Sequence, residues 1–236
     1  MNNSPRMGLP LLQAAQAQKH VTVNEALVLL DGVGQMSLIS ATLSVPPGLN
    51  SDGDCYAVPV GAVNEWAGNI GDVAIFSNGG WVFVTPQKGW RTWVADVQAS
   101  AIFDGSLWLA GAVALSANNA ATVQEVIEIE QTIAAGTTDL ALAAIPAFSI
   151  VFGVTGRVTG AISGTLATWR LGVVGSDTRY GAGLGLAQGA WVRGLTSSPL
   201  TYYANTDLLL SGEGGDFAGG DVRLAVHLMR LEVPMV

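Results

Sequence analysis

Glycine divides this sequence into short apolar runs, and this spacing restricts the folds available to the chain. The 30 glycines fall between the runs and not in one tract, as in turns that join β-strands. Strand-like runs occupy residues 55–59, 73–77, 81–85, 91–94, 101–103 and 107–109. Two of the connections, Asn78-Gly79-Gly80 and Asp104-Gly105-Ser106, contain residues that tolerate positive φ and predict hairpin turns. We therefore expect a small antiparallel β meander in the first half, where five of the seven tryptophans supply enough aromatic surface to form a core from few residues.

The second half continues with strand-like runs at a similar spacing. They cover residues 139–145, 147–155, 165–174, 191–194, 200–203, 208–210 and 222–231. Apolar and polar residues also alternate over residues 127–133, which is the period of a half-exposed strand, with a short helix as the alternative. The last run alternates Leu224, Val226 and Leu228 with Arg223, Ala225 and His227, which places His227 on a polar face. These runs and their glycine-rich joints predict a jelly-roll-like β-sandwich.

Helix is expected only near the start of the chain. Thr22 and Glu25 form a capping box ahead of an apolar repeat at helical spacing, which predicts a helix over residues 23–36. A shorter helix over residues 9–19 would have Pro10 in its first turn. The fold class is therefore mainly β, with short N-terminal helices.

An uncharged segment of small residues separates the two halves. It covers residues 111–121 and lacks any hydrophobic period, which is typical of a linker. The sequence thus predicts an N-terminal helix-plus-meander module over residues 1–110 and a C-terminal sandwich over residues 122–236.

The charge balance excludes several classes of partner. The formal net charge is −8, and the ten basic residues are spread over both halves, so no basic patch for nucleic acid is present. Glycine, proline or polar residues interrupt every long apolar stretch, so we expect no membrane insertion. No secretion signal is visible, which indicates synthesis in the cytoplasm. The single cysteine, Cys55, excludes an internal disulfide and is expected to be a buried apolar residue.

Several long motifs resemble a known family. Residues 9–109 carry LPLLQAAQAQKHVTVNEALVLLD, TPQKGWRTWVAD and AIFDGSLW. These motifs resemble a family of unknown-function domains in fibre and spike proteins of alphaproteobacterial prophages and gene transfer agents. The later runs WRLGVVGSDTRYGAGLGLAQGAW and LTYYANTDLLLSGEGGDFAGGDVRLAVHL resemble the β-sandwich that often follows this domain.

The resemblance implies a function for the whole chain. It implies a head spike or fibre subunit on the surface of a virion or gene transfer agent particle, bound to a capsid or spike-base protein. Such subunits are homotrimers that adhere to capsular polysaccharide of the recipient cell. The resemblance supplies no catalytic or ligand residues. An adaptor that joins the capsid or baseplate to another adhesin is the first alternative.

Catalytic chemistry has little support in the residues themselves. His20 and His227 are the two histidines, and neither belongs to a triad motif. Carboxylates that a glycoside hydrolase would need are available in the second half at Asp177, Asp207, Glu213, Asp216 and Asp221. The last three also provide the oxygen ligands that Ca²⁺ prefers, although no EF-hand or repeat spacing is present. We expect a non-enzymatic protein without cofactor or metal, with a capsule-degrading glycoside hydrolase as the second alternative.

Glycan binding needs flat apolar surface and a few fixed polar groups. The second half supplies a predicted glycan-binding set consisting of Arg179, Tyr180, Trp191, Arg193, Tyr202, Tyr203 and Asp207. We expect Arg179 and Tyr180 to make the main contacts, because the SDTRYG run has the composition of a loop on a rigid sandwich. Adjacent Tyr202 and Tyr203 point to opposite faces if they lie in a strand, so at most one of them belongs to the core.

A homotrimer, which the resemblance to fibre proteins implies, is the first testable expectation. Half of the residues are hydrophobic and 12% are charged, which leaves more apolar surface than a monomer usually exposes. Light scattering of the purified full chain should give three times the chain mass. A monomer at micromolar concentration in mild salt would contradict the prediction.

Overall fold

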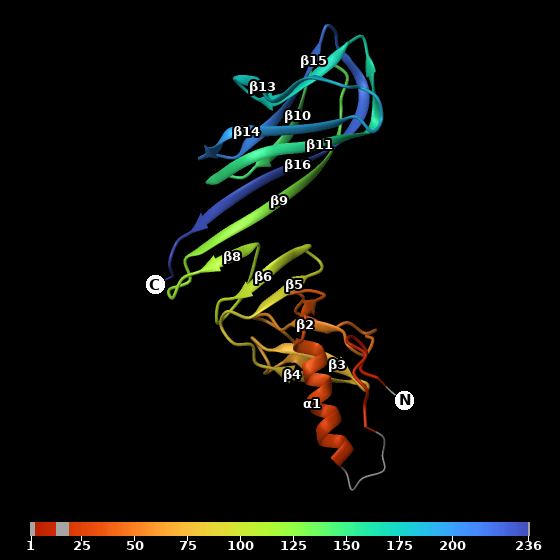
Figure 1. The fold of residues 1–236 in the computed structure, drawn as a ribbon, viewed down its shortest axis with the longest axis vertical. Helices are drawn as coiled ribbons and strands as arrows, with labels where there is room; N and C mark the ends of the chain where they lie inside the picture. Colours follow the sequence, from red (N-terminus) through yellow and green to blue (C-terminus); the bar gives the residue numbers. More distant parts are fainter. Residues whose placement is uncertain (1–2, 13–18, 236) are drawn as a thin grey trace. The chain divides into compact units, whose positions relative to one another are not determined.

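The computed structural model describes residues 3–12 and 19–235. The chain forms two compact units, and the boundary between them falls between Asn119 and Ala120. The described part is mainly β, with a single α-helix near its start (Figure 1). The predicted fold class is therefore confirmed. No helix among the described residues has the length and apolar character needed to cross a bilayer.

The first unit contains the helix and two small sheets. Its elements are α1 (Lys19–Val33), β1 (Ser37–Leu38), β2 (Cys55–Ala57), a 3₁₀ turn η1 (Asn64–Trp66), β3 (Val73–Ser77), β4 (Gly80–Val84), β5 (Arg91–Val94), β6 (Ala99–Phe103), β7 (Trp108–Ala110) and β8 (Ala112–Leu115). One sheet has the order β2-β3-β4, and the other has the order β1-β5-β6-β7. The expected single antiparallel meander is wrong in one respect, because β4 does not pair with β5 and the strands form two sheets. β1 extends the second sheet by pairing with β5 in parallel.

The predicted hairpin turns are confirmed. Asn78 and Gly79 adopt φ of 51° and 80° between β3 and β4, the left-handed conformations that such turns require. In the β6–β7 turn, Gly105 has a φ of 107°, and the carboxylate of Asp104 accepts hydrogen bonds from the backbone N–H groups of Ser106 and Leu107. The segment expected to be a linker, residues 111–121, contains β8 and the first residue of the following strand.

The helix begins and ends earlier than the predicted residues 23–36. It starts at Lys19, so the expected capping pair Thr22 and Glu25 lies inside it. Two residues end the helix after Val33. The N–H of Gly34 still donates to the carbonyl of Leu30, but Gln35 adopts a φ of 47°, and this left-handed conformation stops the helical hydrogen bonding. Of the shorter helix expected over residues 9–19, residues 13–18 lie outside the described part of the chain. Residues 9–12 are not helical, which contradicts the expectation, because Pro10 forms an isolated antiparallel bridge with Asn3.

Buried aromatic rings and a buried carboxylate hold the first unit together. The ring of Trp66 is fully buried, and its centroid lies 5.3 Å from that of Tyr56 and 5.2 Å from that of Trp81. Cys55 is buried as predicted.

Asp31 is also buried. Burial raises the pKa of its carboxyl, but hydrogen bonds from Ser4, Met7 and Arg6 outweigh the effect of burial, so the pKa is lowered overall.

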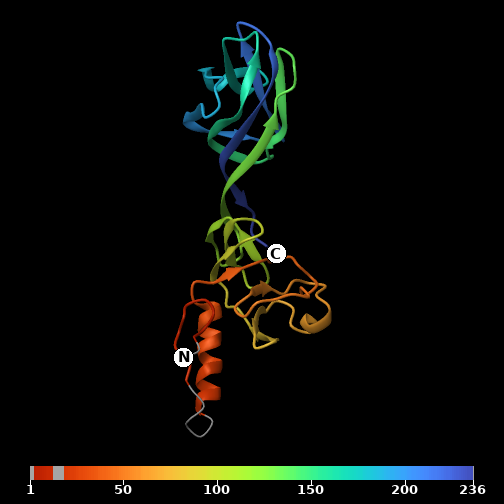
Figure 2. The same cartoon turned by 90° about the vertical axis from the view of Figure 1, so that its right-hand side faces the viewer.

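The second unit is a β-sandwich. Its strands are β9 (Ala121–Thr132), β10 (Thr138–Ile145), β11 (Ser149–Gly164), β12 (Thr168–Val173), β13 (Ser176–Leu184), β14 (Trp191–Tyr202), β15 (Thr206–Glu213) and β16 (Phe217–Glu232). One sheet has the order β10-β15-β12-β13, and the strands of the other that belong to this unit have the order β14-β11-β16-β9. All pairings within these two sets are antiparallel. Figures 1 and 2 show β9 beside β16 along its length.

Side-chain alternation decides which face of each strand is buried. Val222, Leu224, Val226 and Leu228 of β16 are buried in the core of the sandwich. Arg223, Ala225 and His227 therefore lie on the outer face, as the sequence predicts. Residues 127–132 belong to β9 and alternate in burial, so the strand is confirmed and the helical alternative is wrong.

Three strand boundaries differ from the sequence-based expectation. The runs at residues 191–194 and 200–203 belong to one strand, β14, and the run that ends at residue 155 continues in β11 as far as Gly164. The SDTRYG segment is not a loop, because it forms most of β13. A tight turn explains this difference, since Gly175 adopts a φ of 85° and returns the chain directly along β12.

The two sheets come into close contact where β13 meets β14. A Cβ atom at Gly194 would lie 2.2 Å from the carbonyl oxygen of Tyr180 and 2.6 Å from its Cβ. These contacts involve rigid backbone, which a larger residue at this position would have to displace. Glycine is therefore required at this crossing.

We predict that Gly194→Ala lowers the free energy of unfolding by about 1 to 3 kcal/mol. Differential scanning calorimetry of the full chain should show the loss in the transition of the second unit. Gly80→Ala is the matched control, because no atom lies within 4 Å of the added Cβ there. Equal melting temperatures for Gly194→Ala and the unmodified chain would contradict the close approach.

Candidate functional site

The outer face of the sheet β14-β11-β16-β9 has an open depression with a volume of about 540 Å³. We call it the outer-face depression and define it by its charged and aromatic lining residues together with Thr155. These are Glu128, Thr155, Arg157, Trp191, Arg193 and Arg223. Four strands that are distant in sequence each contribute at least one of these residues.

Strand register gathers these side chains in two adjacent rows. In the first row, Arg157 lies opposite Trp191 on one side and Arg223 on the other. In the second row, Thr155 lies opposite Arg193 and Ala225, and Ala225 in turn pairs with Glu128. Directly opposed side chains on one face of a sheet are about 4.5–5.5 Å apart at their Cβ atoms. The depression is therefore a direct product of the register of β11.

Trp191 is the most exposed tryptophan of the second unit. It is 63% exposed at the start of β14, which forms an edge of the sheet. The guanidinium carbon of Arg193 lies 5.5 Å from the centroid of its ring, within the range of a cation–π contact. Arg193 thereby orients the indole ring beside the depression and leaves it accessible.

Charged groups of both signs line the rest of the depression. Arg223 forms ion pairs with Glu130 and with Glu128, whose carboxylate lies 3.6 Å from the guanidinium. Arg157 donates to the carbonyl of Gly189 over 3.3 Å. Beside them, the hydroxyl of Thr155 lies 2.9 Å from Nε2 of His227. The depression thus combines an exposed ring with several fixed donors and acceptors, the combination that glycan recognition uses.

Three residues of the predicted glycan-binding set lie elsewhere and join the two sheets. Tyr180 and Tyr202 are only 2% and 9% exposed, and their hydroxyl oxygens lie 2.7 Å apart. Arg179 donates to the hydroxyl of Tyr202 over 3.0 Å, and its guanidinium carbon lies 6.0 Å from that ring centroid. Burial, and then the hydrogen bond with Tyr202, raise the pKa of Tyr180. Both tyrosine rings are part of the core of the sandwich.

The remaining two predicted residues are also outside the depression. Tyr203 follows the last residue of β14 and is 76% exposed, so the expectation that Tyr202 and Tyr203 face opposite sides agrees with their burial. Asp207 accepts a hydrogen bond of 2.6 Å from the backbone N–H of Ala143. Of the predicted set, the structure therefore brings Trp191 and Arg193 together at the depression.

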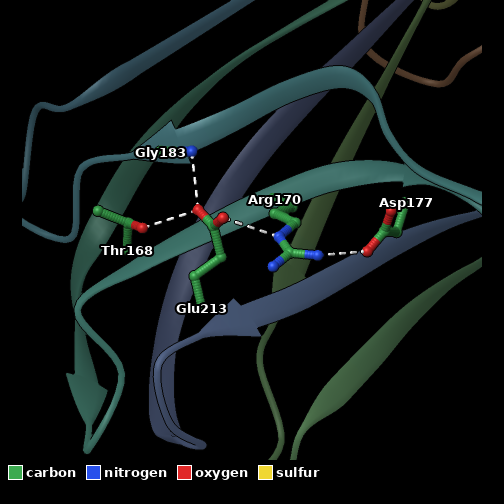
Figure 3. Close-up of polar contacts among 5 residues, drawn as sticks. All are labelled: Thr168, Arg170, Asp177, Gly183 and Glu213. Carbon is green, nitrogen blue, oxygen red and sulfur yellow. Dashed lines mark hydrogen bonds and ion pairs between the residues drawn. The ribbon is translucent and has the colours of Figure 1, made fainter.

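A second polar cluster lies on the other sheet of the sandwich, where Figure 3 shows Arg170 between two carboxylates. Its guanidinium lies 2.8 Å from Asp177 on one side and 2.8 Å from Glu213 on the other. The second oxygen of Glu213 accepts hydrogen bonds from the hydroxyl of Thr168 and the backbone N–H of Gly183. The cluster thus links strands β12, β13 and β15.

These contacts determine the chemistry of the cluster. Hydrogen bonds from Thr168 and Gly183, and then Arg170, lower the pKa of the Glu213 carboxyl. A general acid in glycoside hydrolysis requires a raised pKa, so this carboxyl is suited to a structural ion pair. In the described part of the chain, no three His, Cys, Asp or Glu side chains are grouped as a metal site would require, so Glu213, Asp216 and Asp221 do not form the Ca²⁺ ligand set considered from the sequence.

Four residues of the depression were absent from the predicted set. Arg223 and Glu128 were recognisable from the alternation of their strands, which places both on a polar face. The positions of Thr155 and Arg157 on this face were harder to predict, because Gly156 resembles the end of a strand. In the structure Gly156 faces the core, and a Cβ atom there would lie 2.7 Å from Leu224.

Comparisons with known proteins match part of the chain. Residues 23–109 match the model of a family described as "Protein of unknown function (DUF2793)", which agrees with the motifs of the first half. A chain from the structure of the cyanophage Pam1 capsid asymmetric unit is similar at 26% sequence identity, over 48% of this chain and 85% of that chain, with a TM-score of 0.31. A TM-score of this size does not establish a shared fold. The search among curated proteins found no match.

The Glu213 cluster predicts a pH dependence of stability. The ordinary glutamate pKa is 4.5, and because the folded-state pKa is lower, Glu213 stabilises the fold above this pH and loses that contribution as the pH falls through the folded-state value. Glu213→Gln should therefore unfold at lower urea concentration at neutral pH, with a difference from the unmodified chain that shrinks as the pH falls below the ordinary glutamate pKa of 4.5.

The matched control for this prediction is Glu65→Gln, which removes an exposed carboxylate of the first unit. Urea unfolding at a series of pH values measures both variants against the unmodified chain. A difference between Glu213→Gln and the unmodified chain that stays constant across the acidic range would show that the charge of Glu213 does not stabilise the fold.

Proposed function

We propose that the chain is a virion fibre or head spike subunit that attaches the particle to a cell-surface polysaccharide without cleaving it. The motifs of the first half resemble those of fibre and spike proteins, which supports a fibre module, and the family match over residues 23–109 covers the same part of the chain. The observation that carries the binding role is the exposed ring of Trp191, held by Arg193 at the outer-face depression. In this proposal the first unit connects to a capsid or spike-base protein, and three chains form the spike.

An exposed tryptophan suits a polysaccharide because the apolar face of a sugar ring stacks on the indole. The surrounding guanidinium, hydroxyl and carboxylate groups provide donors and acceptors for sugar hydroxyls. An open depression on a sheet also admits the middle of a long polymer, whereas an enclosed pocket admits only a small molecule or a chain end. Weak contact at each copy is sufficient, since a trimer gains avidity from three equivalent sites.

Non-catalytic binding is supported by the state of the carboxylates. Glu213 and Asp177 flank Arg170 as ion-pair partners, and Glu128 at the depression is paired with Arg223. A glycoside hydrolase needs one carboxyl that is free to donate a proton. These three carboxylates are placed to neutralise arginines.

We predict that Trp191→Ala weakens attachment of the full chain to capsulated alphaproteobacterial cells by about tenfold or more, because the stacking surface is lost. Binding of fluorescently labelled protein to capsulated cells and to a capsule-deficient mutant measures the effect. Because the ring is on the surface, the melting temperature should change little.

Trp93→Ala is the matched control, since Trp93 is an exposed tryptophan of the first unit. Loss of attachment in Trp93→Ala, with Trp191→Ala unaffected, would assign recognition to the first unit. Equal attachment of the unmodified chain to both kinds of cell would favour the adaptor function. Release of new reducing ends from purified capsule would instead identify a hydrolase.

A further inference from the structure

The arginines of the sandwich fall into two groups according to their partners. Arg170, Arg223 and Arg230 each form ion pairs with one or two carboxylates. Within residues 3–12 and 19–235, no carboxylate forms an ion pair with Arg157, Arg179 or Arg193. Arg179 donates to the hydroxyl of Tyr202, whereas Arg157 and Arg193 line the outer-face depression beside Trp191. In a chain with a net charge of −8, two cations without carboxylate partners at one site are notable.

Register brings these two cations close to a third. Arg157 lies directly opposite Arg223 across β11 and β16, and it is diagonal to Arg193, which pairs with the neighbouring Thr155. Like charges directly opposite each other on a sheet are destabilising. The carboxylates of Glu128 and Glu130 compensate Arg223 from the β9 side, but the charges on the β14 side stay uncompensated. A bound anion would supply the missing negative charge there.

We infer that the outer-face depression recognises an acidic sugar unit, with the ring of a uronic acid against Trp191 and its carboxylate at Arg157 and Arg193. The inference rests on the proposed function and specifies its ligand class. Guanidinium groups match carboxylates geometrically, because their parallel N–H donors bind both oxygens. The carboxylate of Glu128 lies toward β9 and repels a second anion, so the charged group of the ligand is directed to the β14 side, where the indole lies.

The test compares polymers that differ only in their carboxylates. The full chain is measured by biolayer interferometry against immobilised alginate and polygalacturonate, each in its native and its carboxyl-reduced form. The unmodified chain should bind at least one native polymer about tenfold more tightly than its reduced form, and this preference should fall at high salt. Arg157→Gln and Arg193→Gln should each remove most of the preference.

Two further variants separate charge recognition from stacking. Trp191→Ala should weaken binding to the native and the reduced polymer alike, because the stacking surface serves both. Arg157→Lys keeps a positive charge and should retain part of the preference that Arg157→Gln loses. Arg91→Gln is the matched control, since it removes an exposed arginine of the first unit and should bind as the unmodified chain does.

The outcomes distinguish this inference from the proposed function. The inference that the depression prefers an acidic sugar is overturned if the chain binds native and reduced polymers with equal affinity. It is also overturned if the chain binds neither native polymer. Attachment to capsulated cells that still depends on Trp191 would then leave the proposed function in place. Loss of preference in Arg91→Gln as large as in Arg157→Gln would also overturn the inference, because general charge would then explain the binding.

Discussion

The alternation of side chains along β16 is the constraint on which the rest of the sandwich depends. Val222, Leu224 and Val226 point into the core and are fully buried. The strand pairs with β11 on one side and β9 on the other, so its inward residues fix the register of both neighbours. A slip of one residue would bury Arg223 and expose Leu224, which the core does not permit. The two rows of the outer-face depression are thus set by apolar packing on the opposite face of the same sheet.

The same chain uses arginine in two ways, and the strand neighbours determine which one applies. Arg170 lies between Glu213 and Asp177. These two carboxylates neutralise its charge, and the ion pairs link three strands. Arg157 lies opposite a tryptophan and another arginine and has a backbone carbonyl as its acceptor. A guanidinium in that setting keeps most of its capacity to bind a carboxylate. Binding capacity in this sandwich therefore depends on which cations the fold leaves without a carboxylate.

Much of the fold was predictable from the sequence because local signals agreed with it. Asn78-Gly79-Gly80 predicted a hairpin, and the alternation around Leu224 predicted the polar face that carries His227. The strand β13 was not predictable in the same way, because SDTRYGAGL has the composition of a loop. It becomes a strand through its partner β12, where Leu171 pairs with Gly181. Tertiary pairing overrides local propensity in such a segment.

The residues proposed from the sequence include Trp191 and Arg193 of the depression but not Arg157, and glycine explains the difference. Gly156 and Gly160 both lie in β11, where sequence reasoning treats glycine as a strand end. Here they permit close packing, since a Cβ atom at Gly156 would meet Leu224 and one at Gly160 would meet the carboxylate of Asp221. The strand therefore continues through Gly156 and presents Arg157 on the outer face.

Tryptophan shows why residue type alone does not identify a binding surface in this chain. Trp66 is fully buried between Tyr56 and Trp81, and Trp169 is buried in the sandwich, where its indole N–H donates to the carbonyl of Gly185. Trp191 differs from both because its neighbours in β14, Val192 and Gly194, face the core. Alternation then requires the indole to face outward. The register that Gly194 permits therefore also exposes the ring of Trp191. Both the close approach of the two sheets and the outward-facing indole depend on β14.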